Sequence, residues 1–167
     1  NLDSLPFPAW DKVDMDYYTQ PNPYGIRGIY LSTFYILTSR GCPSRCTLCV
    51  AKKLRECYSG QVYIRSRSAK NIFEEVKLLK EKYGIDGFYI IDDFFITFKE
   101  NAINFCRLLL KNKIRVWWGC ETKVTALSEE IMNYFSKSGC KQIDFGVESE
   151  SQKILNRIKK DITLELT

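Results

Sequence analysis

The sequence predicts an α/β protein in which helices cover a parallel β-sheet. From Ile29 onward, short stretches rich in β-branched and aromatic residues alternate four times with stretches of helical periodicity. Each helical stretch is long enough to serve as a right-handed crossover between two parallel strands. Hydrophobic residues make up 45% and charged residues 27% of the 167 residues, which is ordinary for one folded domain. We therefore expect strand–helix units that share one sheet and one core.

The first 28 residues have a different composition from the rest of the chain. They contain four of the five prolines, a composition that favours extended chain over a regular element. The first strand is predicted in "IYLSTFYILTS", which begins at Ile29 and leads directly into a cysteine-rich loop. After this loop, "VYIRS" is a candidate for a short extended piece.

The next unit is predicted from a capped amphipathic helix. Ser68 can cap a helix that carries Ile72, Val76 and Leu79 on one face and ends near Gly84. The stretch "GFYIID" follows as a buried strand.

The following helix is predicted from a capping box, formed by Thr97 and Glu100. Its expected apolar face consists of Ala102, Ile103, Cys106, Leu109 and Leu110.

The last two units follow the same pattern. The stretch "IRVWWGCE" is the third predicted strand, and Ser128 then opens a helix with Glu129 and Glu130 in its first turn. This helix is expected to stop at Gly139. "KQIDFGVE" is the fourth predicted strand, and "SQKILNRIKK" is its helix.

Chemically active side chains follow each predicted strand. The cysteine loop comes after the first strand, "DDFF" after the second, "CETK" after the third and "ES" after the fourth. Because the carboxyl ends of parallel strands meet at one edge of a sheet, these stretches are expected to lie together.

The cysteine loop contains Cys42, Cys46 and Cys49 within "TSRGCPSRCTLCVAKK". Three thiolates do not complete a tetrahedral zinc site, and the sequence contains no histidine that could help. Recruitment of Cys57 would give a closed four-thiolate zinc site or a fully ligated electron-transfer cluster. Buried, unligated thiols are a third interpretation. A cubane iron–sulfur cluster held by three thiolates, with one iron left open, is the fourth.

Composition also bears on the cellular setting. Seven cysteines without a recognisable signal peptide favour a reducing, cytoplasmic location over a secreted disulfide scaffold. No apolar run approaches the roughly 20 residues of a membrane helix. The 25 Lys and Arg residues are interleaved with 20 Asp and Glu residues, which is typical of a solvated surface and does not favour nucleic acid as a partner.

The motif Cys42-x3-Cys46-x-Leu48-Cys49, directly after the first strand, resembles the CxxxCxΦC signature of the radical S-adenosylmethionine (SAM) enzymes. The resemblance implies a 4Fe–4S cluster bound by these three cysteines, with SAM on the open iron. It also implies reductive cleavage of SAM to a 5′-deoxyadenosyl radical. The electron for this cleavage would come from a reductant such as flavodoxin or ferredoxin. The family's fold is a full or partial (β/α) barrel of TIM type with about six units. Residues 29–167 would then be a truncated core holding about the first four of them.

The resemblance also implies contacts to SAM. Leu48 would offer an apolar surface beside the adenine. Asp92 and Asp93 occupy the place of a Gly-Gly-Glu-like stretch that receives the SAM amino group, although this sequence has "DDFF" there.

Further contacts are implied after the third and fourth strands. Glu148 and Ser149 match a segment near the cofactor, where a carboxylate can accept hydrogen bonds from ribose hydroxyls. Lys123 stands where relatives commonly have an arginine, so it keeps the charge for a carboxylate but loses the bidentate fork. Arg65 and Arg67 match basic residues of the family, and a solvated helix entry explains them equally well.

The remaining thiols are interpreted as free. We expect free buried thiols at Cys57, Cys106, Cys120 and Cys140, and a redox-active or ligand-facing role stays open for Cys120.

Three stretches resemble a particular branch of the family. "LDSLPFPAWD" is similar to the linker that joins a cobalamin-binding domain to the radical domain, so residues 1–28 would be an extended interdomain linker. "TSRGCPSRCTLC" and "FGVESESQKILNRIKK" also resemble this branch, which includes anaerobic magnesium-protoporphyrin ester cyclases and methyltransferases. Cobalamin would bind the full-length protein through a domain absent here. Because strands five and six are also absent, we expect little turnover by this segment alone.

Two other functions remain open. One is a methylthiotransferase-like enzyme acting on RNA or a ribosomal protein, and the other is a non-enzymatic zinc or electron-transfer module that needs Cys57. The open edge of the last strand would invite self-association. The substrate and net reaction are not predicted.

Overall fold

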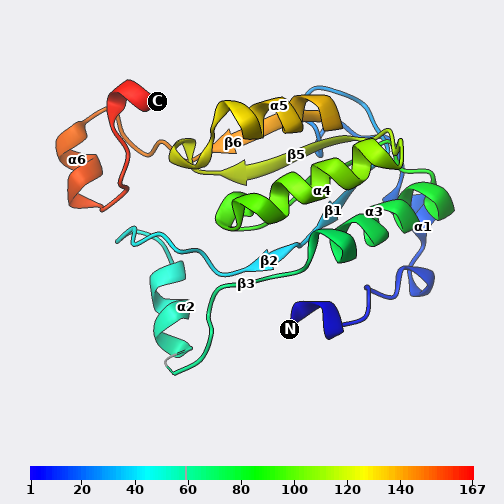
Figure 1. Cartoon of the computed structure of the whole chain (residues 1–167), viewed down its shortest axis with the longest axis horizontal. Coiled ribbons are helices and arrows are strands. Elements are labelled where there is room, and N and C mark those ends of the chain that lie inside the picture. Colours follow the sequence, from blue (N-terminus) through cyan, green and yellow to red (C-terminus); the bar gives the residue numbers. More distant parts are fainter. Residues whose placement is uncertain (59) are drawn as a thin grey trace.

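The computed structural model describes residues 1–58 and 60–167 and contains a four-stranded, fully parallel sheet in the order β1-β4-β5-β6. The strands are β1 (Thr33–Ile36), β4 (Gly87–Ile90), β5 (Trp117–Thr122) and β6 (Cys140–Phe145). Three helices lie in one layer over one face of this sheet (Figure 1). They are α3 (Ala69–Tyr83), α4 (Lys99–Lys111) and α5 (Glu129–Ser138). The predicted α/β class, with four strand–helix units and a parallel sheet, is confirmed.

The carboxyl ends of the strands point toward two shorter helices. These are α2 (Ala51–Cys57) and α6 (Gln152–Arg157), at the left of Figure 1. The helix predicted in "SQKILNRIKK" is therefore present, with six residues. A final 3₁₀ turn, η5 (Leu164–Leu166), follows it.

A two-stranded antiparallel ribbon and α2 follow β1 and were not fully predicted. The ribbon consists of β2 (Ser39–Arg40) and β3 (Arg65–Ser66). Only the last two residues of the predicted extended piece "VYIRS" are strand. The seven residues of α2 lack a long apolar stripe, which is why periodicity did not indicate a helix there.

The N-terminal stretch is less extended than its prolines suggested. It forms three short helical segments, η1 (Leu2–Ser4), η2 (Trp10–Lys12) and α1 (Met15–Tyr18). Leu2, Met15 and Ile26 are buried. The first strand begins at Thr33 instead of Ile29, because Leu31 pairs in an isolated bridge with Asn22.

Two of the predicted helix starts are confirmed by side-chain caps. The Ser68 hydroxyl accepts a hydrogen bond from the Asn71 amide, and the Ser128 hydroxyl accepts one from the Ile131 amide. Both helices end at a left-handed glycine, Gly84 or Gly139.

The predicted capping box of α4 is wrong. Phe98 occupies the N-cap position, while the Thr97 hydroxyl donates a hydrogen bond back to the Phe94 carbonyl at 2.7 Å. Glu100 instead pairs with Arg107 at 3.0 Å. The predicted apolar face is buried except for Leu110, which is 39% exposed.

Aromatic side chains dominate the core between the sheet and the helices. Trp118 of β5 is fully buried, stacks parallel to Phe88 of β4 and meets Phe135 of α5 edge-on, with ring centroids 4.8 Å apart. Its indole N–H donates to the Ser138 carbonyl at 3.1 Å, so its polar atom is also satisfied. Trp118 therefore joins two strands and one helix.

A buried carboxylate ties the end of β4 to the end of β1. Asp92, 1% exposed, accepts hydrogen bonds from the backbone amides of Thr38 and Ser39 at 2.6 and 3.0 Å and from both their hydroxyls. Burial raises the pKa of the Asp92 carboxyl, and these hydrogen bonds oppose the rise. Asp92 thus fixes the direction in which the chain leaves β1.

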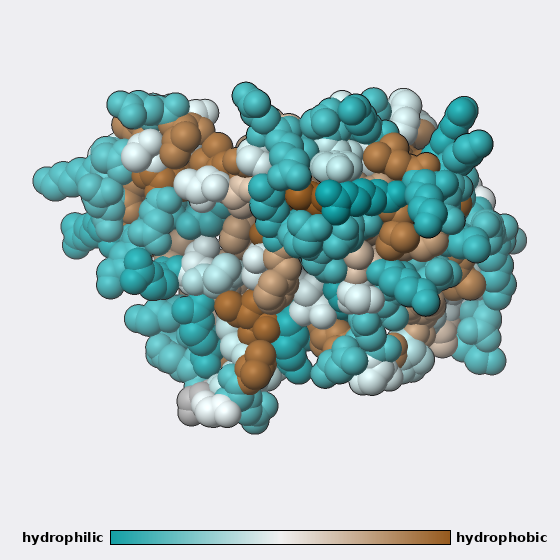
Figure 2. All heavy atoms as spheres, in the orientation of Figure 1, coloured by the Kyte–Doolittle hydropathy of each residue, from teal (hydrophilic) through white to brown (hydrophobic). Residues whose placement is uncertain are grey.

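Polar side chains cover most of the surface in this view, with hydrophobic residues in separate patches (Figure 2). In the part of the chain that the structure describes, every helix is too short or too polar to cross a membrane.

We predict that Trp118→Ala lowers the free energy of unfolding by about 3–5 kcal/mol, because it removes a buried aromatic side chain and leaves a cavity. The neighbouring Trp117, which is 40% exposed, provides the matched control. Trp117→Ala is expected to cost less than about 1 kcal/mol. Urea unfolding of both variants measures the difference, and equal losses would contradict the packing described here.

We also predict a pH-dependent effect of Asp92→Asn. The pKa of Asp92 is raised in the folded chain above its ordinary value of 3.8, so the folded chain holds this proton more tightly than the unfolded chain. The contribution of Asp92 to stability therefore falls as the pH rises from 3.8 through the raised pKa. The variant lacks this titration, so it should gain stability relative to the parent as pH rises. Urea midpoints across this range measure the trend. A relative loss would mean that the hydrogen bonds outweigh burial.

Candidate functional site

A cavity of about 190 Å³ lies at the carboxyl ends of the strands, beside the cysteine loop. Its walls come from the cysteine loop and the first residue of α2, from the end of β5, and from the stretches after β4, β5, β6 and α6. The chemically active lining residues are Cys42, Cys46, Cys49, Asp93, Glu121, Lys123, Glu148 and Lys160. The predicted meeting of strand-end side chains at one edge is therefore observed.

The cysteine loop is held from two sides. Arg55 of α2 donates hydrogen bonds from Nη2 to the carbonyls of Cys42 and Ser44, at 2.6 and 3.0 Å. On the other side, the Thr47 amide donates to the Ile158 carbonyl at the end of α6, at 2.9 Å. The loop is thus fixed between two helices that are far apart in the sequence.

The three loop cysteines differ in exposure but line the same cavity. Cys46 is buried, Cys42 is half-buried and Cys49 is exposed. Within residues 1–58 and 60–167, no three cysteine or acidic side chains surround a common point as they would for a single metal ion. A cubane cluster binds each thiolate through a different iron, so its ligands need not converge on one atom. Three soft donors along one wall fit such a cluster.

The other four cysteines lie outside this cavity. Cys57 is exposed at the last residue of α2. Cys106 and Cys120 are fully buried, and burial raises the pKa of the Cys106 thiol to about 12. The neighbouring Cys140 thiol and burial raise the pKa of Cys120. No disulfide forms among the described residues. The expected burial holds for Cys106 and Cys120, whereas Cys140 is half-buried and Cys57 is exposed.

Charged groups on the far wall of the cavity are paired. Lys160 Nζ lies 2.8 Å from Glu148 Oε1, and the Lys160 side chain is only 11% exposed. Glu148 has a left-handed backbone (φ 71°), and a Cβ at Gly146 would come within 2.5 Å of the Glu148 carboxylate. Burial raises the pKa of Glu121, and the charges of Asp144 and Asp93 raise it further.

The structure brings together most of the residues predicted to contact a cofactor. Leu48, Asp93, Lys123 and Glu148 line the cavity with the three cysteines. Asp92 and Ser149 do not line it.

Asp92 is engaged with β1, as described above, and the Ser149 hydroxyl accepts a hydrogen bond from the Ser151 amide at 3.1 Å. Sequence reasoning missed Glu121 and Lys160. Glu121 could have been found, because it stands in "CETK" at the end of a predicted strand, whereas Lys160 carries no such signal.

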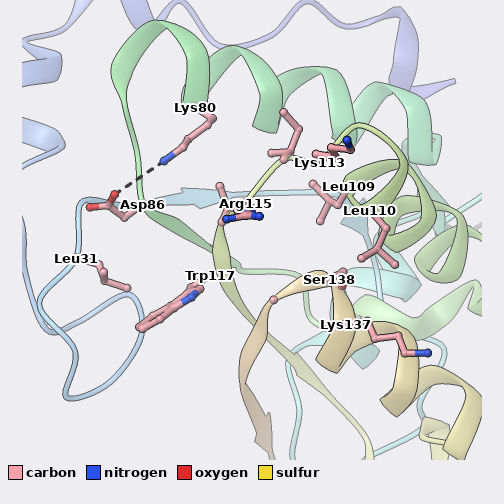
Figure 3. Close-up of a pocket in the computed structure, with 13 residues that line it drawn as sticks. Leu31, Lys80, Asp86, Leu109, Leu110, Lys113, Arg115, Trp117, Lys137 and Ser138 are labelled. Atoms are coloured by element: carbon pink, nitrogen blue, oxygen red, sulfur yellow. Dashed lines mark ion pairs between the residues drawn. The ribbon is translucent and has the colours of Figure 1, made fainter.

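A larger hollow lies elsewhere, at the amino ends of the strands (Figure 3). It measures about 720 Å³ and contains no cysteine. Lys80 donates to the Ile85 carbonyl at 2.8 Å and lies 3.9 Å from Asp86. Lys80 and Lys137 stand in the last turns of their helices, where cations stabilise the helix dipole. Size alone therefore does not identify the functional site.

A search of solved structures finds a similar fold in a radical SAM methyltransferase, TsrM from Kitasatospora setae, solved with cobalamin and a [4Fe-4S] cluster bound. The TM-score is 0.70 at 19% identity, over 91% of this chain and 28% of that protein. At this identity the match shows the fold alone.

Two curated proteins are also similar along the sequence. Cytidylyl-2-hydroxyethylphosphonate methyltransferase of Streptomyces wedmorensis is 33% identical over 99% of this chain and 30% of its own length. Anaerobic magnesium-protoporphyrin IX monomethyl ester cyclase of Rubrivivax gelatinosus is 29% identical over 76% of this chain and 22% of its own length. The chain spans about a third or less of the curated relatives it matches.

The family profile described as "Radical SAM superfamily" matches residues 36–167, which is most of the chain. This match covers the cysteine loop and all four strands of the parallel sheet. The chain belongs to the radical SAM superfamily, and its four strand–helix units form part of that family's (β/α) barrel.

Proposed function

We propose that this chain is the core of an iron–sulfur oxidoreductase that binds a 4Fe–4S cluster through Cys42, Cys46 and Cys49. The observation that carries the proposal is that these three thiols line one cavity at the carboxyl ends of the strands, and Cys57 does not. When bound, the cluster would supply the electron that cleaves SAM to methionine and a 5′-deoxyadenosyl radical. The electron would come from a small reductant such as flavodoxin or ferredoxin in a reducing cytoplasm.

The chain's own residues would orient SAM in this cavity. The Asp93 carboxylate would accept hydrogen bonds from the SAM amino group. Asp92 would act indirectly, because its carboxylate is already occupied by Thr38 and Ser39. Lys123 would face the SAM carboxylate as a single charge.

The opposite side of the cofactor would be held by the β6 segment and the cysteine loop. The Glu148 carboxylate would accept hydrogen bonds from the ribose hydroxyls. Lys160 Nζ, 2.8 Å from Glu148 Oε1, would orient this carboxylate. Ser149 follows in the same turn and stays a candidate for this contact. Leu48, 58% exposed beside the cysteines, would cover the adenine.

The net reaction of the full-length protein is a separate proposal. Two of the similar proteins reported above are methyltransferases and one is a cyclase, so their net reactions differ. We therefore propose for this chain only the step of SAM cleavage, and leave the net reaction open. Cobalamin would bind in a further domain that comes before residues 1–28, and these residues would be the linker from that domain to the radical SAM core. This segment alone is expected to turn over little, since it spans only part of its relatives.

Two alternatives stand behind the main proposal. A methylthiotransferase-like enzyme acting on RNA or a ribosomal protein would use the same cysteine cavity. A zinc or electron-transfer module would need Cys57 as its fourth ligand, and the exposed position of Cys57 outside the cavity disfavours it.

We predict that anaerobic reconstitution with iron and sulfide gives a reduced cubane signal in electron paramagnetic resonance, and that SAM changes this signal. Cys46→Ser is expected to lose most of the bound iron, because it removes one of three ligands. Cys57→Ser is the matched control and should keep the cluster. A cluster that ignores SAM and requires Cys57 would overturn the proposal.

We also predict concentration-dependent self-association through β6. This strand pairs only with β5 among the described residues, so its other edge can accept a further strand. Phe145→Lys, at a position 40% exposed on β6, should weaken the association by placing a charge at the edge. Sedimentation velocity over a concentration series measures it, and a monomer at every concentration would contradict it.

A further inference from the structure

A second pocket adjoins the cysteine cavity and has no role in the proposal above. It measures about 310 Å³ and lies between the β2–β3 ribbon, α2 and the end of β4. Its polar lining residues are Ser39, Arg40, Tyr58, Tyr63, Arg65 and Asp93. Asp93 also lines the cysteine cavity, so the two spaces share a wall.

Two arginines face each other across the ribbon. Arg40 of β2 is the cross-strand partner of Arg65 of β3. Like charges at directly opposed positions of an antiparallel pair repel each other and destabilise the pairing. Among the residues that the structure describes, neither side chain has a hydrogen bond or ion pair, and Arg65 Nε is buried without a partner. Arg40 is exposed and can be solvated by water, so the unexplained group of this pair is the buried Nε of Arg65.

Arg67 shows what a structural arginine looks like in the same stretch. Its guanidinium binds Glu75 at 2.5 Å, Asn71 Oδ1 at 2.6 Å and the Leu37 carbonyl at 3.0 Å. Glu75 is 1% exposed, so this pair is a buried connection between the ribbon and α3. By contrast, Arg65 leaves its buried Nε without a hydrogen bond, and Arg40 beside it is exposed at the same pocket.

Aromatic side chains complete the polar wall. The Tyr63 hydroxyl is buried without a hydrogen-bond partner. A phenol hydroxyl can donate a hydrogen bond to an anion, and that of Tyr63 lines this pocket. Arg65 lies over the ring of Tyr58 at 5.7 Å, which orients its guanidinium.

The pocket wall is packed directly against the cysteine loop. Gly41 has a left-handed backbone (φ +84°), and a Cβ there would come within 2.8 Å of the Tyr63 carbonyl and 2.9 Å of its ring. Arg40, Gly41 and Cys42 are consecutive, so a ligand held by Arg40 lies beside the first cluster cysteine.

We propose that this pocket binds an oxyanion group of the substrate, either phosphoryl or carboxylate, between Arg40 and Arg65 with the Tyr63 hydroxyl as a further donor. The planar arginine forks match either group in a bidentate manner. The apolar part of the substrate would lie on Leu37 and Ile91 and extend past Asp93 toward the cysteine cavity. This substrate class rests on the proposed function of that cavity.

The test is calorimetric titration of the 167-residue chain, before any iron is added, with phenylphosphonate and separately with benzoate. The first probe carries a phosphoryl-type group and the second a carboxylate, so their relative affinities identify the preferred oxyanion. Arg40→Gln and Arg65→Gln are each expected to weaken the better probe by about tenfold or more. Arg40→Lys and Arg65→Lys, which keep the charge and the ribbon, should weaken it by a smaller factor.

Arg115→Gln is the matched control. Arg115 is an exposed arginine that lines the hollow at the opposite end of the strands (Figure 3). Its substitution should leave both affinities unchanged, and circular dichroism verifies that each variant is folded.

Three results would each overturn the proposal. They are no binding of either probe, affinities unchanged in all four Arg40 and Arg65 variants, and an equal loss in Arg115→Gln. Because neither iron nor SAM is present, failure here leaves the cluster experiment unaffected. Equally, failure of the cluster experiment leaves the measured anion site in place.

Discussion

The placement of the functional site depends on one buried carboxylate. Asp92, at the end of β4, binds the amides and hydroxyls of Thr38 and Ser39, which directly follow β1. Arg40, Gly41 and Cys42 come next in the chain. The direction of the cysteine loop and the position of the β2–β3 ribbon are therefore both set by this contact. A buried acceptor with four protein donors leaves no room for an alternative exit from β1.

In the described part of the chain, the three long helices form one layer over one face of the sheet. The aromatic core around Trp118 holds α3, α4 and α5 on that face, and the strand ends remain open. The cavity is then closed by loops from different units, because Arg55 of α2 and the Ile158 carbonyl each hold the cysteine loop. The rigid sheet thus carries loops that are held by hydrogen bonds to one another and to α2, outside the aromatic core.

Sequence patterns within a few residues predicted the strands and most of the helix starts. The features that were not predicted depend on contacts between residues far apart in the sequence. Ser68 and Ser128 were found as caps because a cap needs only the next three residues of its own chain. Thr97 satisfied the same pattern, yet its hydroxyl turned back to the Phe94 carbonyl, which the spacing does not reveal.

The candidate site follows the same division. The cysteines and Asp93 were predicted from their positions after strands, while the role of Asp92 required partners 54 residues away. Lys160, in the stretch after α6, reaches Glu148 across 12 residues of the chain, and no sequence pattern near Lys160 indicates this. The positive φ of Glu148 is likewise a tertiary feature.

The two-sided hold on the cysteine loop has a consequence for biosynthesis. A ribosome makes the cysteines and α2 early, but the Ile158 carbonyl that receives the Thr47 amide emerges only after β4, β5 and β6 have been made. During that interval the cysteine loop can be held by Arg55 of α2, but the hydrogen bond from Thr47 to Ile158 cannot yet form. If the loop binds the proposed cluster only in its fully supported state, the cluster would be inserted late, after translation of the sheet.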